Sequence, residues 1–120
     1  MADRVLVWHI PKVLSNKVEG TNASTEYVLD DDYVPVKVRL SQKVAQAGDP
    51  NIIDINDDGV SIFGSVKPNI NQGLLESEWE TFLPTLTYME KGSIITLDVD
   101  QISKTTPGEK LTVSLEMDKA

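Results

Sequence analysis

The segment from Asp54 to Gly59 contains the residue types that begin a calcium-binding loop. Its sequence is DINDDG, which places Asp54, Asn56 and Asp58 at alternate positions before a glycine. Oxygen ligands at alternate positions, followed by glycine at a sharp turn, open the calcium loop of EF-hand proteins. The match stops halfway, because Ser65 stands at the twelfth position, where such loops carry a bidentate glutamate. A hairpin turn is the competing interpretation, since Asn, Asp and Gly tolerate the positive φ of tight turns.

Two other groups of carboxylates could do chemistry. Asp98 and Asp100 are two positions apart in an alternating segment, so they should share a face at a separation of about 7 Å. That spacing is compatible with a carboxylate pair in general acid–base catalysis. The run from Asp30 to Asp32 could attract a divalent cation. In both cases the simpler interpretation is structural, because a solvated strand face or loop is rich in charge.

Other residues that carry enzyme chemistry are scarce. His9 is the only histidine and cysteine is absent, so zinc sites and Cys–His dyads lack their parts. The sequence contains neither a G-x-S-x-G nucleophile motif nor the glycine-rich phosphate loops of nucleotide-binding proteins. We therefore expect a protein that is not an enzyme and has no cofactor. Calcium at Asp54, Asn56 and Asp58 is the one ion to consider.

The elements that must position these residues are strands. Segments 92–100 and 111–118 alternate strictly between apolar and polar side chains. Because an extended chain points successive side chains to opposite faces, each segment should have one dry and one wet face. The dry faces comprise Ile95, Leu97 and Val99 in the first segment and Leu111, Val113, Leu115 and Met117 in the second. Pro107 and Gly108 signal a turn between them, which predicts a hairpin that closes an antiparallel sheet.

The rest of the chain adds short strands. We expect them at 4–10, 26–29, 34–40, 51–55, 60–63 and 85–89, with Val34, Val36, Val38 and Leu40 on one face of the third. A helical turn is one interpretation of 42–48. Segment 74–83 favours a short helix with a bent strand as the alternative, because its apolar residues form a helical stripe. Six to eight short strands with turn signals between them predict an all-β, antiparallel β-sandwich, jelly-roll-like, with at most one short helix near 74–83.

Length and charge limit the kind of protein. The 120 residues favour a single domain at 1–120, with an N-terminal strand at 4–10 and an irregular segment at 11–33 that could serve as an arm. The formal charge of −8 argues against binding to a nucleic-acid backbone, which requires a basic surface. No stretch approaches the ~20 apolar residues of a membrane span, and the N-terminus does not match a signal peptide. We expect synthesis in the cytoplasm without export, and no membrane partner.

The strand at 4–10 is apolar on both faces, which makes it a candidate interface. Its candidate contact residues are Val5, Val7, Trp8 and Ile10, and they could extend the edge of a neighbouring subunit's sheet. The alternative is that this strand completes the chain's own sandwich.

Several motifs occur in an order that resembles a β-sandwich domain of tailed-bacteriophage virion proteins. They cover about two-thirds of the chain: VRL at 38–40, a Gly-Asp turn at 48–49, the hairpin at 53–63, KPNI followed by glycine at 67–73, and KGSIITLDVDQI, a Thr-Pro-Gly connection and LTVSLEM at 91–117. The resemblance implies a structural protein of head fibres, capsid decorations or tail appendages, often trimeric, with other virion proteins as partners. It implies no catalytic residues. Segment 74–83 departs from the pattern by being longer and more acidic, as a protein-specific contact or a lid would be.

The resulting expectation is a non-enzymatic virion protein made in the host cytoplasm. The short chain begins with methionine, which favours a whole small gene product, a capsid decoration or head-fibre accessory subunit that binds the particle surface as a homo-oligomer, with a trimer favoured. The alternative is a tail-associated receptor- or carbohydrate-binding module. It predicts exposed, clustered aromatic residues and a cation at the Asp54 loop.

Overall fold

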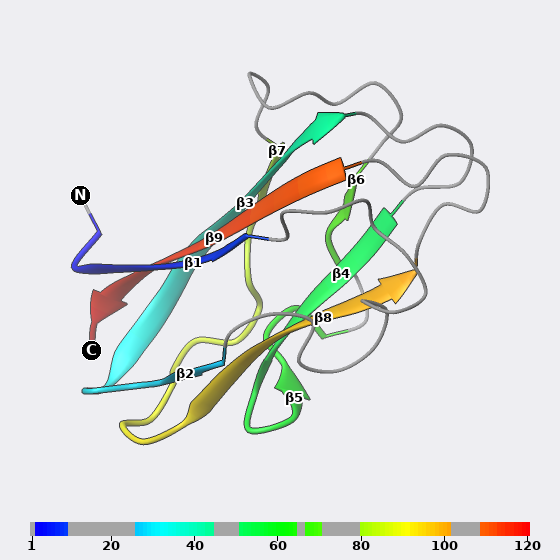
Figure 1. Ribbon diagram of the computed structural model, residues 1–120. Helices are drawn as coiled ribbons and strands as arrows, with labels where there is room; N and C mark the ends of the chain where they lie inside the picture. Colours follow the sequence, from blue (N-terminus) through cyan, green and yellow to red (C-terminus); the bar gives the residue numbers. More distant parts are fainter. Residues whose placement is uncertain (1, 10–25, 45–50, 65–66, 71–79, 102–108) are drawn as a thin grey trace.

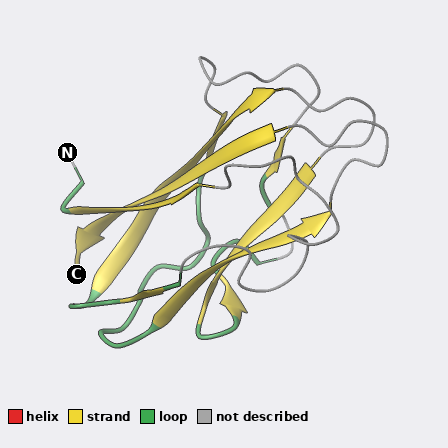
Figure 2. Ribbon diagram, in the orientation of Figure 1, coloured by secondary structure: helices red, strands yellow, loops and turns green. Residues whose placement is uncertain are grey.

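Two antiparallel sheets face each other across one hydrophobic core in the computed structural model (Figure 1). The structure describes residues 2–9, 26–44, 51–64, 67–70, 80–101 and 109–120. All regular structure in these ranges is strand, and none of it is helix (Figure 2). The all-β prediction and the two-layer antiparallel architecture are therefore confirmed.

The first sheet contains four strands. Their order is β1 (Arg4–His9), β9 (Glu109–Lys119), β3 (Tyr33–Val44) and β7 (Glu80–Phe82). The second sheet has the order β2 (Tyr27–Val28), β8 (Ile94–Gln101), β4 (Asn51–Asp57) and β5 (Val60–Ser61), and β6 (Asn69–Ile70) also pairs with β4. The described residues thus form nine strands, more than the six to eight expected. The strand β6 was not expected and β7 lies where a helix was favoured, whereas the strand expected at 85–89 is absent.

The core lies between the inner faces of the two sheets. Trp8 on β1, Leu40 on β3, Ile55 on β4, Leu97 on β8 and Leu115 on β9 are each at most 1% exposed. The residues predicted for the dry faces of 92–100 and 111–118 are all buried. Full burial of each large aliphatic side chain stabilises the fold by about 1.5–3 kcal/mol relative to exposure.

The predicted closing hairpin is wrong. β8 pairs with β4 and β2, whereas β9 pairs with β1 and β3, so the two alternating strands belong to different sheets. The connection at 102–108 lies outside the described residues. Alternation identifies the dry face of a strand but not its neighbour, and here the two dry faces meet across the core instead of lying side by side.

Because β3 contains a bulge, Val36 does not lie on the core face that the sequence predicted. The pairing with β9 shifts between Pro35 and Lys37, which leaves Val36 without a partner and 39% exposed, while Pro35 is buried. Val38 and Leu40 beyond the bulge face the core as predicted. Proline lacks an N–H and is tolerated where the ladder is already interrupted, so Pro35 is at a suitable position.

Three other segments differ from their predictions. Residues 80–82 form β7, a strand as in the alternative interpretation and not the favoured helix, and Phe82 packs against the core; residues 74–79 lie outside the described part. Residues 85–89 form no strand, and only Met89 makes an isolated bridge, to Tyr33. Residues 42–44 continue β3 instead of beginning a helical turn, and 45–48 are not described. At 42–44 and 80–82, tertiary pairing has outweighed local helical preference.

Candidate functional site

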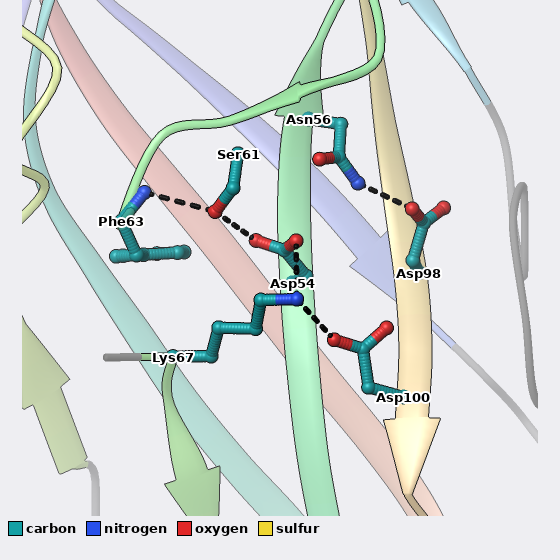
Figure 3. Close-up of polar contacts among 7 residues, drawn as sticks. All are labelled: Asp54, Asn56, Ser61, Phe63, Lys67, Asp98 and Asp100. Atoms are coloured by element: carbon teal, nitrogen blue, oxygen red, sulfur yellow. Dashed lines mark hydrogen bonds and ion pairs between the residues drawn. The ribbon is translucent and has the colours of Figure 1, made fainter. Parts of the chain in front are cut away.

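Four of the residues singled out as possible ligands or catalytic acids, Asp54, Asn56, Asp98 and Asp100, gather on the outer face of the second sheet (Figure 3). We call this group the outer polar cluster; its members are Asp54, Asn56, Ser61, Lys67, Asp98 and Asp100. Asp54 on β4 lies directly opposite Asp98 on β8. Cross-strand neighbours have Cβ atoms about 4.5–5.5 Å apart, and like charges in that position destabilise a sheet. The cluster must therefore supply hydrogen-bond donors to both carboxylates.

Lys67 supplies the positive charge. Its Nζ lies 2.8 Å from Asp100 Oδ2 and 3.3 Å from Asp54 Oδ2. The side chain of Asp54 is 5% exposed, that of Lys67 35% and that of Asp100 33%, so one end of this ion pair is buried and the other reaches solvent. The hydrogen bond with Asp100, with further support from Asp54, raises the pKa of Lys67 and keeps its ammonium charged.

Neutral donors complete the cluster. The Ser61 hydroxyl donates to Asp54 Oδ1 over 2.6 Å and accepts from the backbone N–H of Phe63 over 3.1 Å. Asn56 Nδ2 donates to Asp98 Oδ2. Asn56 and Asp98 are each 8% exposed, so the outer side of β4 and β8 is not the wet face that alternation predicted. Buried polar groups are tolerated here because each of these contacts satisfies an acceptor.

The three candidate calcium ligands have separate protein partners. Asp54 binds Lys67 and Ser61, and Asn56 binds Asp98, as described above. Asp58 Oδ1 accepts from the backbone N–H of Ile94 over 2.8 Å. No group of three His, Cys, Asp or Glu side chains within the described ranges is arranged to hold a metal ion. Asp58 and Gly59 instead form the two-residue turn between β4 and β5, with φ of 49° and 84°, which is the competing hairpin interpretation.

The remaining acid and base candidates also have structural partners. Asp98 accepts a hydrogen bond from Asn56 and Asp100 accepts one from Lys67, so the two carboxylates considered as a catalytic pair have different partners. His9 Nδ1 lies 2.9 Å from the hydroxyl of Thr112 on the neighbouring strand. All three groups lie on strands, and each contacts a neighbouring side chain.

The run from Asp30 to Asp32 makes hydrogen bonds to several distant segments at one end of the sandwich. Asp30 accepts from Arg4 on β1 and, over 2.7 Å, from the Tyr33 hydroxyl, and the second of these bonds is the main reason that the pKa of Asp30 is lowered. Asp32 Oδ1 accepts from the backbone N–H of Lys91 over 2.8 Å. The run therefore caps a turn and secures β1, which is a structural use of its charge.

The candidate interface strand is divided between the core and the surface. Val5 and Val7 are each 47% exposed on the outer face of the first sheet, whereas Trp8 is 1% exposed and faces the core. Ile10 lies outside the described residues. β1 pairs with β9 from Arg4 to His9, so this strand completes the chain's own sandwich and is an edge strand of the described sheet.

Tyr27 covers part of that edge. Its hydroxyl donates to the backbone oxygen of Val7 over 2.6 Å, and its ring meets Trp8 edge-on with centroids 5.4 Å apart. A carbonyl of an edge strand that already accepts a hydrogen bond is less available to an added strand. Sequence reasoning missed the contacts of both Tyr27 and Lys67, because neither residue stands near its partners in the sequence, and the KPNI motif that begins at Lys67 does not identify them.

The described part of the chain has no helix of the length and apolarity needed to cross a membrane. When the chain was compared with protein-family models, with curated proteins and with solved structures, it matched none of them.

Proposed function

We propose that the chain is a non-enzymatic structural subunit of a tailed-phage particle, a capsid decoration or head-fibre accessory that binds the particle surface. The observation that carries the binding role is the outer face of β1, where Val5 and Val7 are each 47% exposed. Exposed apolar side chains that lie together favour burial against another protein. The assignment to a phage particle rests on the sequence resemblance given above, and so does the expectation of a trimer.

The surroundings of these two residues fit a docking face. Across β9 and β3, the row of Val5 continues through Glu116 to Lys37, whose charged groups lie 3.7 Å apart. The row of Val7 continues through Ser114 to Arg39. An apolar strip bordered by polar and charged rows has the composition of a protein interface, with an apolar centre and a polar rim.

Docking through this face is favoured over extension of the sheet edge. The Tyr27 hydroxyl occupies the Val7 carbonyl, which an added strand would need. Burying the exposed halves of Val5 and Val7 would contribute about 1 kcal/mol each. A stable interface buries more than about 1,000 Å² in total, so neighbouring residues of the first sheet must also take part.

A non-enzymatic role is supported by the state of the reactive side chains. Asp54, Asp98 and Asp100 accept from Lys67, Asn56 or Ser61, and His9 contacts Thr112. A general acid or base must be free to exchange its proton with a substrate. Groups committed to neighbours on a strand face are poorly placed for that.

The carbohydrate- or receptor-binding alternative has less support. It predicts a cluster of exposed aromatic rings. Trp8, Tyr33 and Phe63 are at most 3% exposed, and Tyr88, at 48%, is the one large exposed aromatic side chain in the described part of the chain. A single ring does not make the stacking platform that this alternative requires.

The test compares two surfaces, one on each sheet. The double variant Val5→Asp, Val7→Asp should abolish co-sedimentation with isolated capsid shells and, in light scattering, convert a trimer into monomers. Val28→Asp, at a position 61% exposed on the second sheet, is the matched control and should bind as the wild type does. Unchanged binding of the double variant would refute the docking face. Glycan affinity that is lost with chelator, without shell binding, would refute the proposed function in favour of the alternative.

A further inference from the structure

A groove of about 310 Å³ lies at one end of the sandwich, away from the exposed face of β1. Its lining comes from the β4–β5 hairpin and from the chain that leads into β8, and comprises Asp57, Asp58, Val60, Leu86, Tyr88, Glu90 and Ser93. Val60 is 62% exposed and Tyr88 48%, while Leu86 packs against the core. The groove therefore combines an open apolar wall with three carboxylates.

Backbone hydrogen bonds hold both walls in place. On the hairpin side, Asp58 N–H donates to Ile94 O over 3.0 Å, and Ile94 N–H donates back to the Asp58 carboxylate. On the other side, Leu86 N–H donates to Ile62 O over 3.0 Å, and Met89 exchanges two hydrogen bonds with Tyr33. A site with prearranged walls loses little conformational entropy when it is filled.

The charge of the groove is uncompensated. Its lining contains the carboxylates of Asp57, Asp58 and Glu90 and no Lys, Arg or His. Lys91, the nearest cation in the sequence, is exposed and does not line the groove. Burial raises the pKa of Asp57, a hydrogen bond with Ser93 opposes this rise, and the negative charges of Asp58 and Glu90 add to it. A cationic group that entered would relieve this repulsion.

Tyr88 adds a feature that selects among cations. A hydrogen bond with Asp32 is the main cause of the raised pKa of Tyr88, and the Tyr88 side chain lines the groove. A guanidinium is planar, stacks on aromatic rings and pairs with carboxylates through two parallel hydrogen bonds, whereas an ammonium is a compact, strongly hydrated charge. The three methylenes of an arginine side chain can also pack along apolar side chains such as Val60 and Leu86.

We propose that this groove binds an arginine side chain presented by a partner polypeptide, with its guanidinium between Asp57 and Glu90 and against the Tyr88 ring. Apolar residues beside the arginine in the partner cover Val60. The inference is independent of the docking face on β1 and of the phage assignment, because it uses none of the same residues. It gives the acidic chain a specific site for a basic partner, where net charge alone supplies only steering.

The probe is the peptide acetyl-Gly-Leu-Arg-Leu-Gly-amide, with a counterpart in which citrulline replaces arginine. Titration into ¹⁵N-labelled protein should give saturable amide shifts at Val60, Tyr88 and Glu90 with the arginine peptide and none with citrulline. Asp57→Asn should weaken binding roughly five- to tenfold. Asp118→Asn removes the same charge from an exposed position outside the groove, and should leave the affinity unchanged.

Three results would overturn the proposal. The first is the absence of saturable shifts at millimolar peptide. The second is equal binding of the citrulline peptide, which would leave the guanidinium without a role. The third is an equal loss of affinity in Asp57→Asn and Asp118→Asn, which would mean that only the net charge matters. A thermal melt of both variants checks that each one is folded before titration.

Discussion

Replacing Lys67 with methionine tests whether the outer polar cluster is held together by one charge. Methionine keeps most of the side-chain volume and removes the ammonium from its contacts with Asp54 and Asp100, at 3.3 and 2.8 Å. The Asp54 carboxylate would then remain 95% buried opposite Asp98 with only its Ser61 hydrogen bond and no cation. We expect this change to destabilise the fold substantially without altering its architecture.

The size of the effect follows from the exposure of the three side chains. Breaking a fully buried ion pair costs about 3–5 kcal/mol, and breaking an exposed one costs less than about 1 kcal/mol. Asp54 is nearly buried, whereas Lys67 and Asp100 are each about a third exposed and are screened by solvent. An intermediate cost of about 2 kcal/mol is therefore expected, which lowers the Tm of a chain of this length by roughly 8 °C.

Urea unfolding at neutral pH, followed by far-UV circular dichroism, measures this cost. The matched control is Lys119→Met, because Lys119 lies 3.9 Å from Asp31 and both side chains are more than half exposed. That control should cost less than about 0.5 kcal/mol. The additional change Asp54→Asn should restore part of the stability of Lys67→Met, since it removes the unpaired charge and keeps an acceptor for Ser61. Equal costs for the two lysine variants, or no recovery with Asp54→Asn, would refute the reasoning.

The pH dependence of stability is a second test of the role of Lys67 in the outer polar cluster. The pKa of Lys67 is raised in the folded protein, chiefly by its hydrogen bond with Asp100. A group whose pKa rises on folding contributes its full stabilisation below its unfolded value, here 10.5, and loses it as the pH rises through the folded value. The difference in stability between the wild type and Lys67→Met should therefore be constant from neutral pH to about 10.5 and shrink above it.

Three further predictions concern other contacts. Tyr27→Phe removes the hydrogen bond to Val7 O and should cost about 1 kcal/mol in urea unfolding; it should also increase self-association in sedimentation velocity, and an unchanged sedimentation profile would exclude a guarding role. Gly59→Ala places a side chain at φ +84° and should cost about 1 kcal/mol, although no atom would contact the new Cβ; an unaffected midpoint would mean that the turn can change type. The hydrogen bond from the Tyr33 hydroxyl is the main cause of the lowered pKa of Asp30, and Arg4 also lowers it. The contribution of the Asp30 carboxylate to stability is therefore present above pH 3.8 and is lost as the pH falls through the lowered pKa. Asp30→Asn should be less stable than the wild type at pH 6 and equally stable at the lowest pH, which acid titration checks.

The inner faces of the sandwich could be predicted from the sequence because they depend on local periodicity. Leu111 to Met117 alternate without interruption, and every apolar side chain predicted to be dry there is buried. The turn at Asp58 and Gly59 was equally predictable, since both residues accept positive φ and both adopt it. These signals need only the residue and its near neighbours.

Strand partners could not be predicted in the same way. β8 and β9 are consecutive and both alternate, yet they lie in opposite sheets. Which strands pair depends on contacts between distant segments, and a single sequence carries no local signal for them. The bulge at Val36 shows the same limit on a smaller scale, because one extra residue moves it from the predicted core face to the surface while Val38 keeps its place.

The candidate site was predicted in its residue types and missed in its chemistry. Asp54, Asn56, Asp98 and Asp100 were recognised as a source of oxygen atoms, and the structure gathers them on one face. Lys67 could not be assigned to them, because it reaches β4 and β8 from a segment outside both strands. Without a cation from the chain, a carboxylate-rich face suggests a metal ion; with Lys67 in place, the same face is an internal ion pair.

The two outer faces of the sandwich consequently have different capacities for binding. On the second sheet, Asp54, Asn56 and Asp98 are each under 10% exposed within the single chain, so a partner that approached them would gain little additional buried area. On the first sheet, Val5 and Val7 retain about half of their accessible surface. Since the free energy of association comes largely from area that is still exposed, the proposed attachment fits the outer face of β1 better than the polar part of β4 and β8. The hydroxyl of Tyr27 adds a constraint on geometry, because it already donates to the Val7 carbonyl and makes that part of the β1 edge less available to an added strand.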